Sequence, residues 1–369
     1  MWSLAGRMKI AFRTDASLEI GTGHVMRCLT LADALRAQGG DCVFVCRPHR
    51  GHLLEQIRAR GHEVRALPPL PASFVARADD TFHAAWLGLG WTRDAEETLS
   101  LATGERFDWL VVDHYALDRR WEEALRPICG RLMVMDDLAD RAHDCDLLLD
   151  PSLGRTVSDY RNLLPMGAAT LLGPQFALLR PEFAALRGES LARRHSPRLA
   201  QLLITMGGVD KGNATGRVLA ALSSCSLPAT LRITVIMGAH APWLADVRAQ
   251  GALMPVPTKV LVAVDDMARL MARSDMAIGA AGGTSWERCC LGLPTIQFIL
   301  AENQTGIAAQ LAQVGAAVCA DDETLPKAFG DFEDGVSSGQ LAEQSRIASL
   351  ITDGFGADRI AAELSRRLQ

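Results

Sequence analysis

The sequence has no excess of basic residues and no long apolar run. Its 38 Lys and Arg residues are outnumbered by 43 Asp and Glu residues and form no cluster, so the charge pattern of a nucleic-acid-binding protein is missing. No segment approaches the roughly 18 apolar residues of a membrane-spanning helix, and the first residues are too short an apolar run for a signal peptide. These absences predict a cytoplasmic protein with no nucleic-acid partner and no membrane insertion.

Paired cysteines are lacking as well. The nine cysteines are an odd number, no Cys-x-x-Cys motif occurs, and most lie in apolar runs, as Cys42 and Cys46 do, or in expected helices, as Cys289 and Cys290 do. We therefore expect reduced thiols packed in the core, without a disulfide framework or a metal site. The sequence also has no tandem repeat, no low-complexity tract and no G-x-S-x-G or H-E-x-x-H motif.

What the chain does contain is an alternation of apolar β-branched runs with segments of helical periodicity. With 369 residues, 49% of them hydrophobic, it has the size of about two globular domains. The alternation is typical of βα units and parallel sheets. In the first half we expect helices near 24–38, 51–60, 93–103 and 118–126, between strands at 8–13, 41–46, 63–67, 109–112, 132–135 and 147–149.

The pattern weakens from 151 to 196, where Pro, Gly and Arg are frequent, and this predicts an interdomain connection. A second series of strands is expected at 199–206, 231–237, 260–264, 276–279, 295–300 and 316–319. We therefore predict an α/β protein of two doubly wound Rossmann-like domains, 1–185 and 186–369, with the carboxyl ends of both sheets facing one cleft. The last helix, 357–367, suits either half, and the sequence alone does not choose.

A glycine loop follows the first expected strand. Gly21 and Gly23 allow backbone to approach a ligand closely, and a helix beginning near His24 directs its free N–H groups toward that ligand. Met26 replaces the third glycine of a dinucleotide-binding fingerprint, so the loop alone is equally consistent with a tight turn. A histidine at a helix N-terminus is favoured in its neutral form, which a general base needs. His24 is thus a candidate base, with a structural histidine as the alternative.

Two glycine loops are expected in the second domain. Gly207 and Gly208 follow its first strand, and a plain turn with a helix N-cap is the alternative interpretation. The run from Gly282 to Glu287 joins a strand to a helix: Gly282 and Gly283 offer amides for phosphate, Thr284 or Ser285 could cap the helix, and Glu287 could accept hydrogen bonds from ribose hydroxyls. A favourable charge in the first helical turn is the alternative role of Glu287.

Polar side chains also follow other strands. Glu302, Asn303 and Gln304 would face the cleft, where Asn303 could orient water or a sugar group or, alternatively, cap a helix. Asp113, His114 and Tyr115 could supply further polar groups to the pocket. Asp136 and Asp137 would suit a metal, but no His or acid stands at ligand spacing, so no metal site is predicted. Trp86 and Trp91 lie in a Gly-rich stretch that is more typical of a packed loop than of a sugar-binding platform.

This constellation resembles a known family, the UDP-2,4-diacetamido-2,4,6-trideoxy-β-L-altropyranose hydrolases of pseudaminic acid biosynthesis, which are bacterial nucleotide-sugar hydrolases of GT-B architecture. The motifs stand in the family order from Met8 to about residue 320 and comprise Arg13, Asp15, Gly21, Gly23, His24, Arg27, Asp113 to Tyr115, Gly207, Gly208, Asp210, Gly282 to Glu287 and Glu302 to Gln304. Met8 resembles the usual family start, so 1–7 are expected to be an extension, with the translation start at Met1 or Met8 left open.

The resemblance implies removal of UDP by water attack at the anomeric carbon with inversion, without metal or organic cofactor. It implies that His24 is the base, that Tyr115 and Asn303 belong to the active site, and that Gly282, Gly283, Ser285 and Glu287 form the UDP-binding loop. Arg13, Asp15 and Arg27 become substrate contacts, and the remaining substrate-binding candidates are Gly21, Gly23, Gly207, Gly208, Thr284 and Gln304. The segment after Cys319 is expected to form surface helices and loops, being too short for a fused acetyltransferase domain.

Two alternatives remain open. A GT-B glycosyltransferase would use the same UDP-sugar site and pass the sugar to an acceptor instead of water, and the fold alone does not separate the two. A catalytically silent nucleotide-sugar-binding protein would bind UDP and consume nothing. Neither the stereochemistry and N-acyl groups of the sugar nor the oligomeric state can be predicted from the sequence.

Overall fold

The computed structural model describes residues 7–70, 80–102, 104–262 and 264–368. The chain forms two compact units, one of Met1–Leu178 with Gly356–Gln369 and the other of Leu179–Phe355. The division therefore falls at 178/179 rather than at 185/186, and the carboxyl-terminal segment belongs to the first unit. Most of the extension expected at 1–7 lies outside the described residues. Within those residues, no helix is long and apolar enough to cross a membrane.

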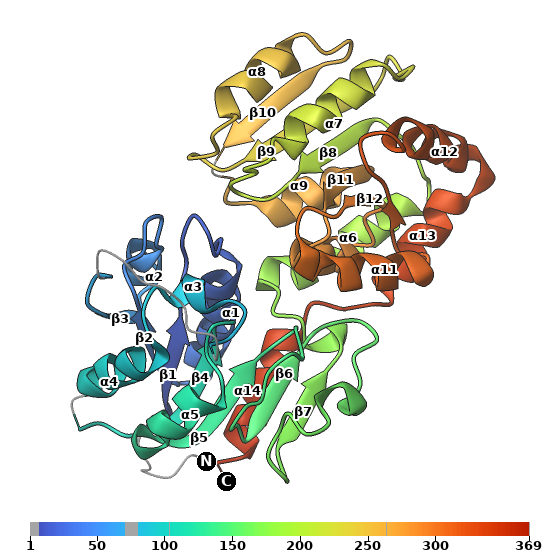
Figure 1. Ribbon diagram of the computed structural model, residues 1–369. Helices are drawn as coiled ribbons and strands as arrows, with labels where there is room; N and C mark the ends of the chain where they lie inside the picture. The colour runs from blue at the N-terminus through green and yellow to red at the C-terminus, as the bar shows by residue number, and fades with distance from the viewer. Residues whose placement is uncertain (1–6, 71–79, 103, 263, 369) are drawn as a thin grey trace. The chain divides into compact units, whose positions relative to one another are not determined.

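The first unit is built on one parallel sheet (Figure 1). Its strands are β1 (Lys9–Thr14), β2 (Asp41–Cys46), β3 (Glu63–Ala66), β4 (Phe107–Asp113), β5 (Cys129–Met135), β6 (Leu147–Asp150) and β7 (Ala169–Leu172), in the order β3-β2-β1-β4-β5-β6-β7. Its helices are α1 (Gly23–Ala37), α2 (Leu54–Ala59), α3 (Ala84–Leu87), α4 (Trp91–Leu101), α5 (Arg119–Leu125) and α14 (Gly356–Arg366), with 3-10 turns η1 (Arg126–Ile128), η2 (Val157–Tyr160) and η3 (Pro174–Phe176).

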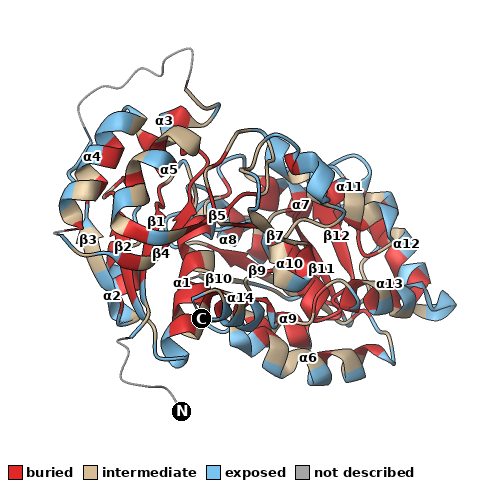
Figure 2. Ribbon diagram, turned by 90° about the horizontal axis from the view of Figure 1, so that it is seen from below, coloured by how far each residue is buried: buried red, intermediate tan, exposed pale blue. Residues whose placement is uncertain are grey.

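Alternate residues of the central strands face two separate apolar layers, because successive side chains of a strand point to opposite faces. In β4, Trp109 and Val111 pack in the layer formed with α1 and α14, whereas Leu110 and Val112 pack in the layer formed with α4 and α5. Both faces of the sheet are thus covered, and the strands are buried along most of their length (Figure 2). This is why the strands appear in the sequence as continuous apolar runs.

The second unit repeats the arrangement with a six-stranded parallel sheet. Its strands are β8 (Gln201–Thr205), β9 (Arg232–Met237), β10 (Thr258–Val262), β11 (Met276–Ala280), β12 (Thr295–Phe298) and β13 (Val318–Cys319), in the order β10-β9-β8-β11-β12-β13. Its helices are α6 (Pro181–Arg194), α7 (Ala214–Ser223), α8 (Leu244–Ala252), α9 (Met267–Arg273), α10 (Thr284–Cys290), α11 (Thr305–Gln313), α12 (Leu325–Ser338) and α13 (Gln340–Ser349), and η4 (Glu302–Gln304) is a 3-10 turn.

Two expectations about local structure need correction, and one question that the sequence left open is answered. The supposed connection at 151–196 contains β7 and α6; β7 is a short, half-buried edge strand, so its apolar run is weak, and Pro181 occupies the first turn of α6, where proline is tolerated. The segment after Cys319 is not confined to the surface, because α12 and α13 place Phe329 and Leu341 in the core of the second unit. The last helix, α14, packs against α1 and η3.

The order of the strands reverses at one point in each sheet. Strand β1 pairs with β2 on one side and β4 on the other, and β8 pairs with β9 and β11 in the same way. Ligands of open α/β sheets bind outside the carboxyl ends of the strands at such a switch point. The segments that follow β1 and β4, and those that follow β8 and β11, are therefore the places where functional side chains are expected.

Candidate functional site

The loop after β1 leads directly into α1. Gly21 has a φ of +82° and closes a small turn in which its amide donates to the carbonyl of Ser17 at 2.9 Å. Helix α1 begins at Gly23 after Thr22, and no side chain caps its first amides. Uncapped amides at the start of a helix attract anions. Gly21 thus forms the tight turn that the sequence left open as an alternative, and no side-chain cap occupies the amides at the start of α1.

His24 is held by a carboxylate from the neighbouring switch-point strand. Its Nδ1 lies 2.7 Å from Oδ1 of Asp113, the last residue of β4. Because a carboxylate only accepts, Nδ1 carries a hydrogen, so the lone pair of a neutral His24 imidazole lies on Nε2. The imidazole is buried, and its ring meets that of Tyr115 edge to face at a centroid distance of 4.6 Å. This is the geometry of a histidine oriented to accept a proton at Nε2.

Asp113 is also clamped by Arg27, one helical turn after His24. The Nε of Arg27 donates to Oδ2 of Asp113 at 2.7 Å, and Nη2 donates to Oδ1 at 2.6 Å. Burial of Asp113 raises the pKa of its carboxyl, but the charge of Arg27 and the hydrogen bonds from Arg27 and His24 outweigh burial and hold that pKa well below its ordinary value. Asp113 therefore stays ionised, and Arg27, predicted as a substrate contact, orients the histidine's partner.

Asp137 joins Arg27 to Tyr115. Its Oδ2 accepts from Nη1 of Arg27 at 3.1 Å, and its Oδ1 accepts from the hydroxyl of Tyr115. Burial and the adjacent Asp137 carboxylate raise the pKa of Tyr115 well above its ordinary value, so the phenol stays protonated. The sequence pointed to Asp137 only as a rejected metal ligand. In the described part of the chain, no three His, Cys, Asp or Glu residues are grouped to hold a metal ion.

Arg13 and Asp15, which were expected to contact substrate, lie inside the first unit. Neither side chain is exposed, and they form an ion pair with an Nη1–Oδ2 distance of 2.8 Å. Arg13 is paired with Asp94 as well, while Oδ1 of Asp15 accepts the amide of Arg47 at 2.6 Å. Their side chains are thus engaged in ion pairs and hydrogen bonds within the first unit.

In the second unit, the loop after β8 is close to the loop after β9. The amide of Gly238 donates to the carbonyl of Gly208 at 3.0 Å, and a Cβ on Gly238 would lie 2.1 Å from that oxygen, so glycine is required there. Asp210 accepts from the amides of Ala214 and Thr215 at 2.8 and 2.9 Å. Its carboxylate therefore occupies the start of α7, which leaves the backbone at Gly207 and Gly208 as the ligand-accessible part of this loop.

The loop after β11 leads into α10 without a side-chain cap. Thr284 and Ser285 were expected to cap this helix, yet their hydroxyls accept from Nη1 and Nη2 of Arg288 at 3.1 and 3.0 Å. Burial lowers the pKa of Arg288 to about 10, so its guanidinium keeps its charge at neutral pH and lies below the loop. The glycines at 282 and 283 thus present uncapped amides beside a positive charge, an arrangement that suits a phosphate group.

Glu287 lies one turn into α10 and has an unusual ionisation. Burial raises the pKa of its carboxyl to about 7, although the charges of Arg180 and Arg288 act in the opposite direction. No other described residue hydrogen-bonds to this carboxyl group. It remains available to accept hydrogen bonds from vicinal hydroxyls.

If Glu287 binds ribose, the affinity for a UDP-sugar should depend on pH near neutrality. The carboxylate accepts two hydrogen bonds, and below pH 7 the group is increasingly protonated and loses that capacity. Affinity should therefore fall by about tenfold from pH 8 to pH 6. Calorimetric titration with UDP-glucose, whose diphosphate does not ionise in this range, measures the effect. Glu287→Gln should bind weakly at both pH values, and an unaltered pH dependence in this variant would exclude Glu287 as the cause.

The turn after β12 carries the remaining predicted residues. Gln304 accepts the amide of Leu300 at 2.9 Å through Oε1, and its Nε2 lies near Gly282, which links this turn to the loop before α10. Asn303 is exposed and caps neither η4 nor α11, whose N-caps are Ala301 and Gln304. The capping alternative for Asn303 is thus wrong, and its amide is free to contact a ligand.

The predicted site residues form two groups, one in each unit. His24, Arg27 and Tyr115 belong to one connected network in the first unit, with Gly21 and Gly23 just before it in the chain. The second group comprises the loops after β8, β11 and β12, namely Gly207, Gly208, Gly282, Gly283, Thr284, Ser285, Glu287, Asn303 and Gln304. The first group has a candidate base, and the second has amides and a carboxylate suited to a nucleotide.

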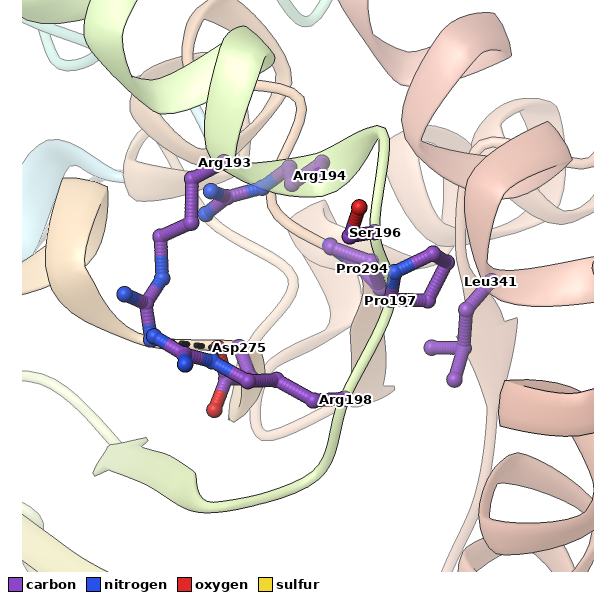
Figure 3. Close-up of a pocket in the computed structure, with 8 residues that line it drawn as sticks. All are labelled: Arg193, Arg194, Ser196, Pro197, Arg198, Asp275, Pro294 and Leu341. Atoms are coloured by element: carbon purple, nitrogen blue, oxygen red, sulfur yellow. Dashed lines mark hydrogen bonds and ion pairs between the residues drawn. The ribbon is translucent and has the colours of Figure 1, made fainter.

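An arginine-lined pocket lies elsewhere in the second unit (Figure 3). Arg193 and Arg198 approach Oδ1 of Asp275 at 2.5 and 3.4 Å, and Oδ2 of Asp275 accepts the amides of Ala200 and Gln201. Asp275 directly precedes β11, so the pocket lies at the amino ends of the strands. Because ligands of such sheets bind at the carboxyl ends, we assign the pocket a structural role in anchoring the segment between α6 and β8.

No protein-family model matches the chain. It is 26% identical over 311 residues to the UDP-2,4-diacetamido-2,4,6-trideoxy-beta-L-altropyranose hydrolase of Campylobacter jejuni, covering 84% of this chain and 98% of that protein. It is 32% identical over 130 residues to the spore coat polysaccharide biosynthesis protein SpsG of Bacillus subtilis, covering 34% of this chain and 38% of that protein. The chain is thus a distant homologue of a UDP-sugar hydrolase over most of its length.

Solved structures share the fold of the whole chain. MurG of Acinetobacter baumannii superposes with a TM-score of 0.70 at 16% identity, covering 98% of this chain and 100% of that one. The protein LpCGTa in complex with UDP gives a TM-score of 0.63 at 12% identity, again covering 98% and 100%. With its parallel sheets of seven and six strands, the chain therefore has the GT-B architecture that the sequence predicts.

Proposed function

We propose that this protein is a nucleotide-sugar hydrolase that removes UDP from UDP-2,4-diacetamido-2,4,6-trideoxy-β-L-altropyranose or a closely related 6-deoxy sugar nucleotide. The observation that carries the proposal is the His24–Asp113 pair at the switch point of the first sheet. The distant similarity to the Campylobacter hydrolase supports the substrate class.

In this mechanism, a water molecule attacks the anomeric carbon from the face opposite to UDP. Nε2 of His24 takes a proton from the water as the new C–O bond forms, and Asp113 stabilises the imidazolium that results. The bond between C1 and the diphosphate oxygen breaks, and its electron pair leaves with UDP. The sugar is released with inverted configuration, and the proton on His24 passes to solvent.

A general base contributes about 10²- to 10⁴-fold to the rate, so the leaving group must supply much of the remainder. Backbone amides at Gly282 and Gly283 would stabilise the negative charge that develops on the departing diphosphate. Glu287 would bind the ribose hydroxyls, and Asn303 would contact the sugar or the water through its free amide. We assign binding of the nucleotide to the second unit and proton transfer to the first.

An NMR time course in H₂¹⁸O tests the proposal, with purified protein, the UDP-diacetamido sugar and no acceptor. Release of UDP with ¹⁸O on C1 of the sugar is the expected result, because the mechanism cleaves the bond between C1 and oxygen. Incorporation of ¹⁸O into UDP would mean attack at phosphorus and would overturn the mechanism. Mass spectrometry of both products distinguishes the two outcomes.

A glycosyltransferase is the second candidate, because the chain shares its fold with solved structures that include a UDP-glucosyltransferase of Polygonum tinctorium. The same His24–Asp113 pair would deprotonate an acceptor hydroxyl as readily as water. An intact substrate in the time course, together with normal UDP binding, would favour the transferase, and an acceptor screen would then follow.

A further inference from the structure

A group of aromatic rings lies beside His24 in the first unit. The rings of Trp86 and Tyr115 are stacked with centroids 5.6 Å apart and an interplanar angle of 27°. His83 lies 4.5 Å from Trp86 and 5.3 Å from Tyr115, and the ring of His24 lies 6.3 Å from Trp86. Trp86 and His83 come from the segment around α3, which the sequence indicated only as a packed loop. That interpretation misses the contact with His24.

Trp86 differs from the core tryptophans of the same unit. Trp109 and Trp121 are fully buried, and their indole N–H groups donate to the carbonyl of Leu364 at 3.2 Å and to Asp94 at 3.0 Å. Trp86 is only partly buried, and its indole N–H has no hydrogen-bond partner among the described residues. Buried tryptophans normally pair this group, so Trp86 differs from the core tryptophans in both its burial and its hydrogen bonding.

Trp91, five residues further along, serves as an internal comparison. It packs at the edge of the apolar layer around α4 and α5, and the guanidinium of Arg120 covers its ring at 5.4 Å. Trp86 instead contacts only the polar-tipped rings of His24, His83 and Tyr115 among the described aromatic residues. The two tryptophans of this stretch therefore have different surroundings, and only Trp86 adjoins the candidate base.

The rings of His83, Trp86 and Tyr115, which we call the aromatic platform, are uncharged at neutral pH. Burial and the nearby charge of Arg141 lower the pKa of His83, although Asp140 acts in the opposite direction, so the imidazole is uncharged at neutral pH. Tyr115 stays protonated, as described above. An uncharged, partly exposed aromatic face beside a base suits a ligand that presents C–H groups.

We propose that Trp86, supported by His83 and Tyr115, is a specificity-determining residue. It binds the apolar face of the sugar while His24 activates the water that attacks the anomeric carbon. The ligand class is a 6-deoxy, N-acylated pyranose, whose ring C–H, C6 methyl and acyl methyl groups together offer more apolar area than a sugar with a free 6-hydroxyl. The assignment rests on the proposed function, since it takes the sugar of that substrate as the occupant.

The kinetic test compares Trp86→Ala and Trp86→Phe with the control Trp91→Phe. Trp86→Ala is expected to lower kcat/KM for the diacetamido 6-deoxy substrate by about 10- to 100-fold, because the apolar contact is lost. The ratio of kcat/KM for this substrate to kcat/KM for UDP-N-acetylglucosamine, which measures the preference of the enzyme, should fall as well. Trp86→Phe should recover most of the activity, since it keeps an aromatic face, and Trp91→Phe should preserve the preference. UDP affinity should be unchanged in all three. An unchanged preference in folded Trp86→Ala would overturn the proposal.

Saturation-transfer NMR separates this proposal from the proposed function. In the His24→Gln background, the C6 and acyl methyl protons of the intact substrate should receive strong saturation from the aromatic protons, and Trp86→Ala should abolish that transfer. If the unaltered protein does not hydrolyse the substrate, and Trp86→Ala nevertheless abolishes the saturation of the methyl protons, the hydrolase function is wrong and the binding role of Trp86 is supported. If hydrolysis occurs but Trp86→Ala leaves the methyl saturation intact, the platform fails and the function stands.

Discussion

The His24→Gln protein is expected to bind UDP as tightly as the unaltered protein and to release it from the sugar nucleotide about 10²- to 10⁴-fold more slowly. Glutamine keeps a polar side chain at the start of α1 but has no basic nitrogen to take a proton from water. The nucleotide is assigned to the loops of the second unit, so its affinity should not respond to a change in the first.

Two measurements decide this prediction. Initial rates of UDP release give the loss of turnover, and calorimetric titration with UDP gives the affinity of the same preparation. His24→Ala should behave in the same way, because it also removes the basic nitrogen. Normal turnover in either variant would show that another group activates the water, and a parallel loss of UDP affinity would show that His24 acts in binding instead.

The second large effect is expected for Asp113→Asn. The new amide donates to Nδ1 of His24, which moves the hydrogen to Nε2 and removes the lone pair that the reaction needs. We expect kcat to fall by about 10²- to 10⁴-fold. Arg27 loses its charged acceptor as well, so the free energy of unfolding should fall by about 1.5–3 kcal/mol.

A matched control exists in the same unit. Glu122 accepts from Nδ1 of His143 at 2.7 Å, the same distance as in the His24–Asp113 pair, and both residues are fully buried. Glu122→Gln should therefore lower stability by a similar amount without a comparable loss of kcat. Denaturant unfolding and initial rates on both variants test this. If the two variants lost turnover equally, the effect of Asp113→Asn would reflect loss of structure.

The strands and the first glycine loop could be predicted from the sequence because their signals are local. Strands β1, β2 and β4 are buried on both faces and appear as apolar runs in the sequence. Gly21 and Gly23 mark the end of the loop that leads into α1. Strand β7 and helix α6 were not predicted because a short, half-buried edge strand and a helix beginning at proline resemble loop sequence.

The sequence pointed to the candidate base and to Asp113, Tyr115 and Arg27 as site residues, but it did not show which of them pair with one another. His24 and Asp113 are separated by 89 residues, and no periodicity in the sequence indicates that β1 and β4 are neighbours in the sheet. The role of Asp137 is visible only in the structure, where Arg27 and Tyr115 both donate hydrogen bonds to its carboxylate. The contact between Trp86 and His24 could not be predicted for the same reason, since a glycine-rich stretch gives no sign of which rings it will meet.

The return of α14 to the first unit has a consequence for biosynthesis. Ile360, Ala361 and Leu364 are fully buried in the layer shared with α1, and Leu364 accepts the indole N–H of Trp109. A ribosome delivers these residues after the whole of the second unit, so the apolar face of the first sheet that α1 and α14 share stays only partly covered while the second unit can already form. The first unit is therefore the last to be completed, although it is the first to be translated.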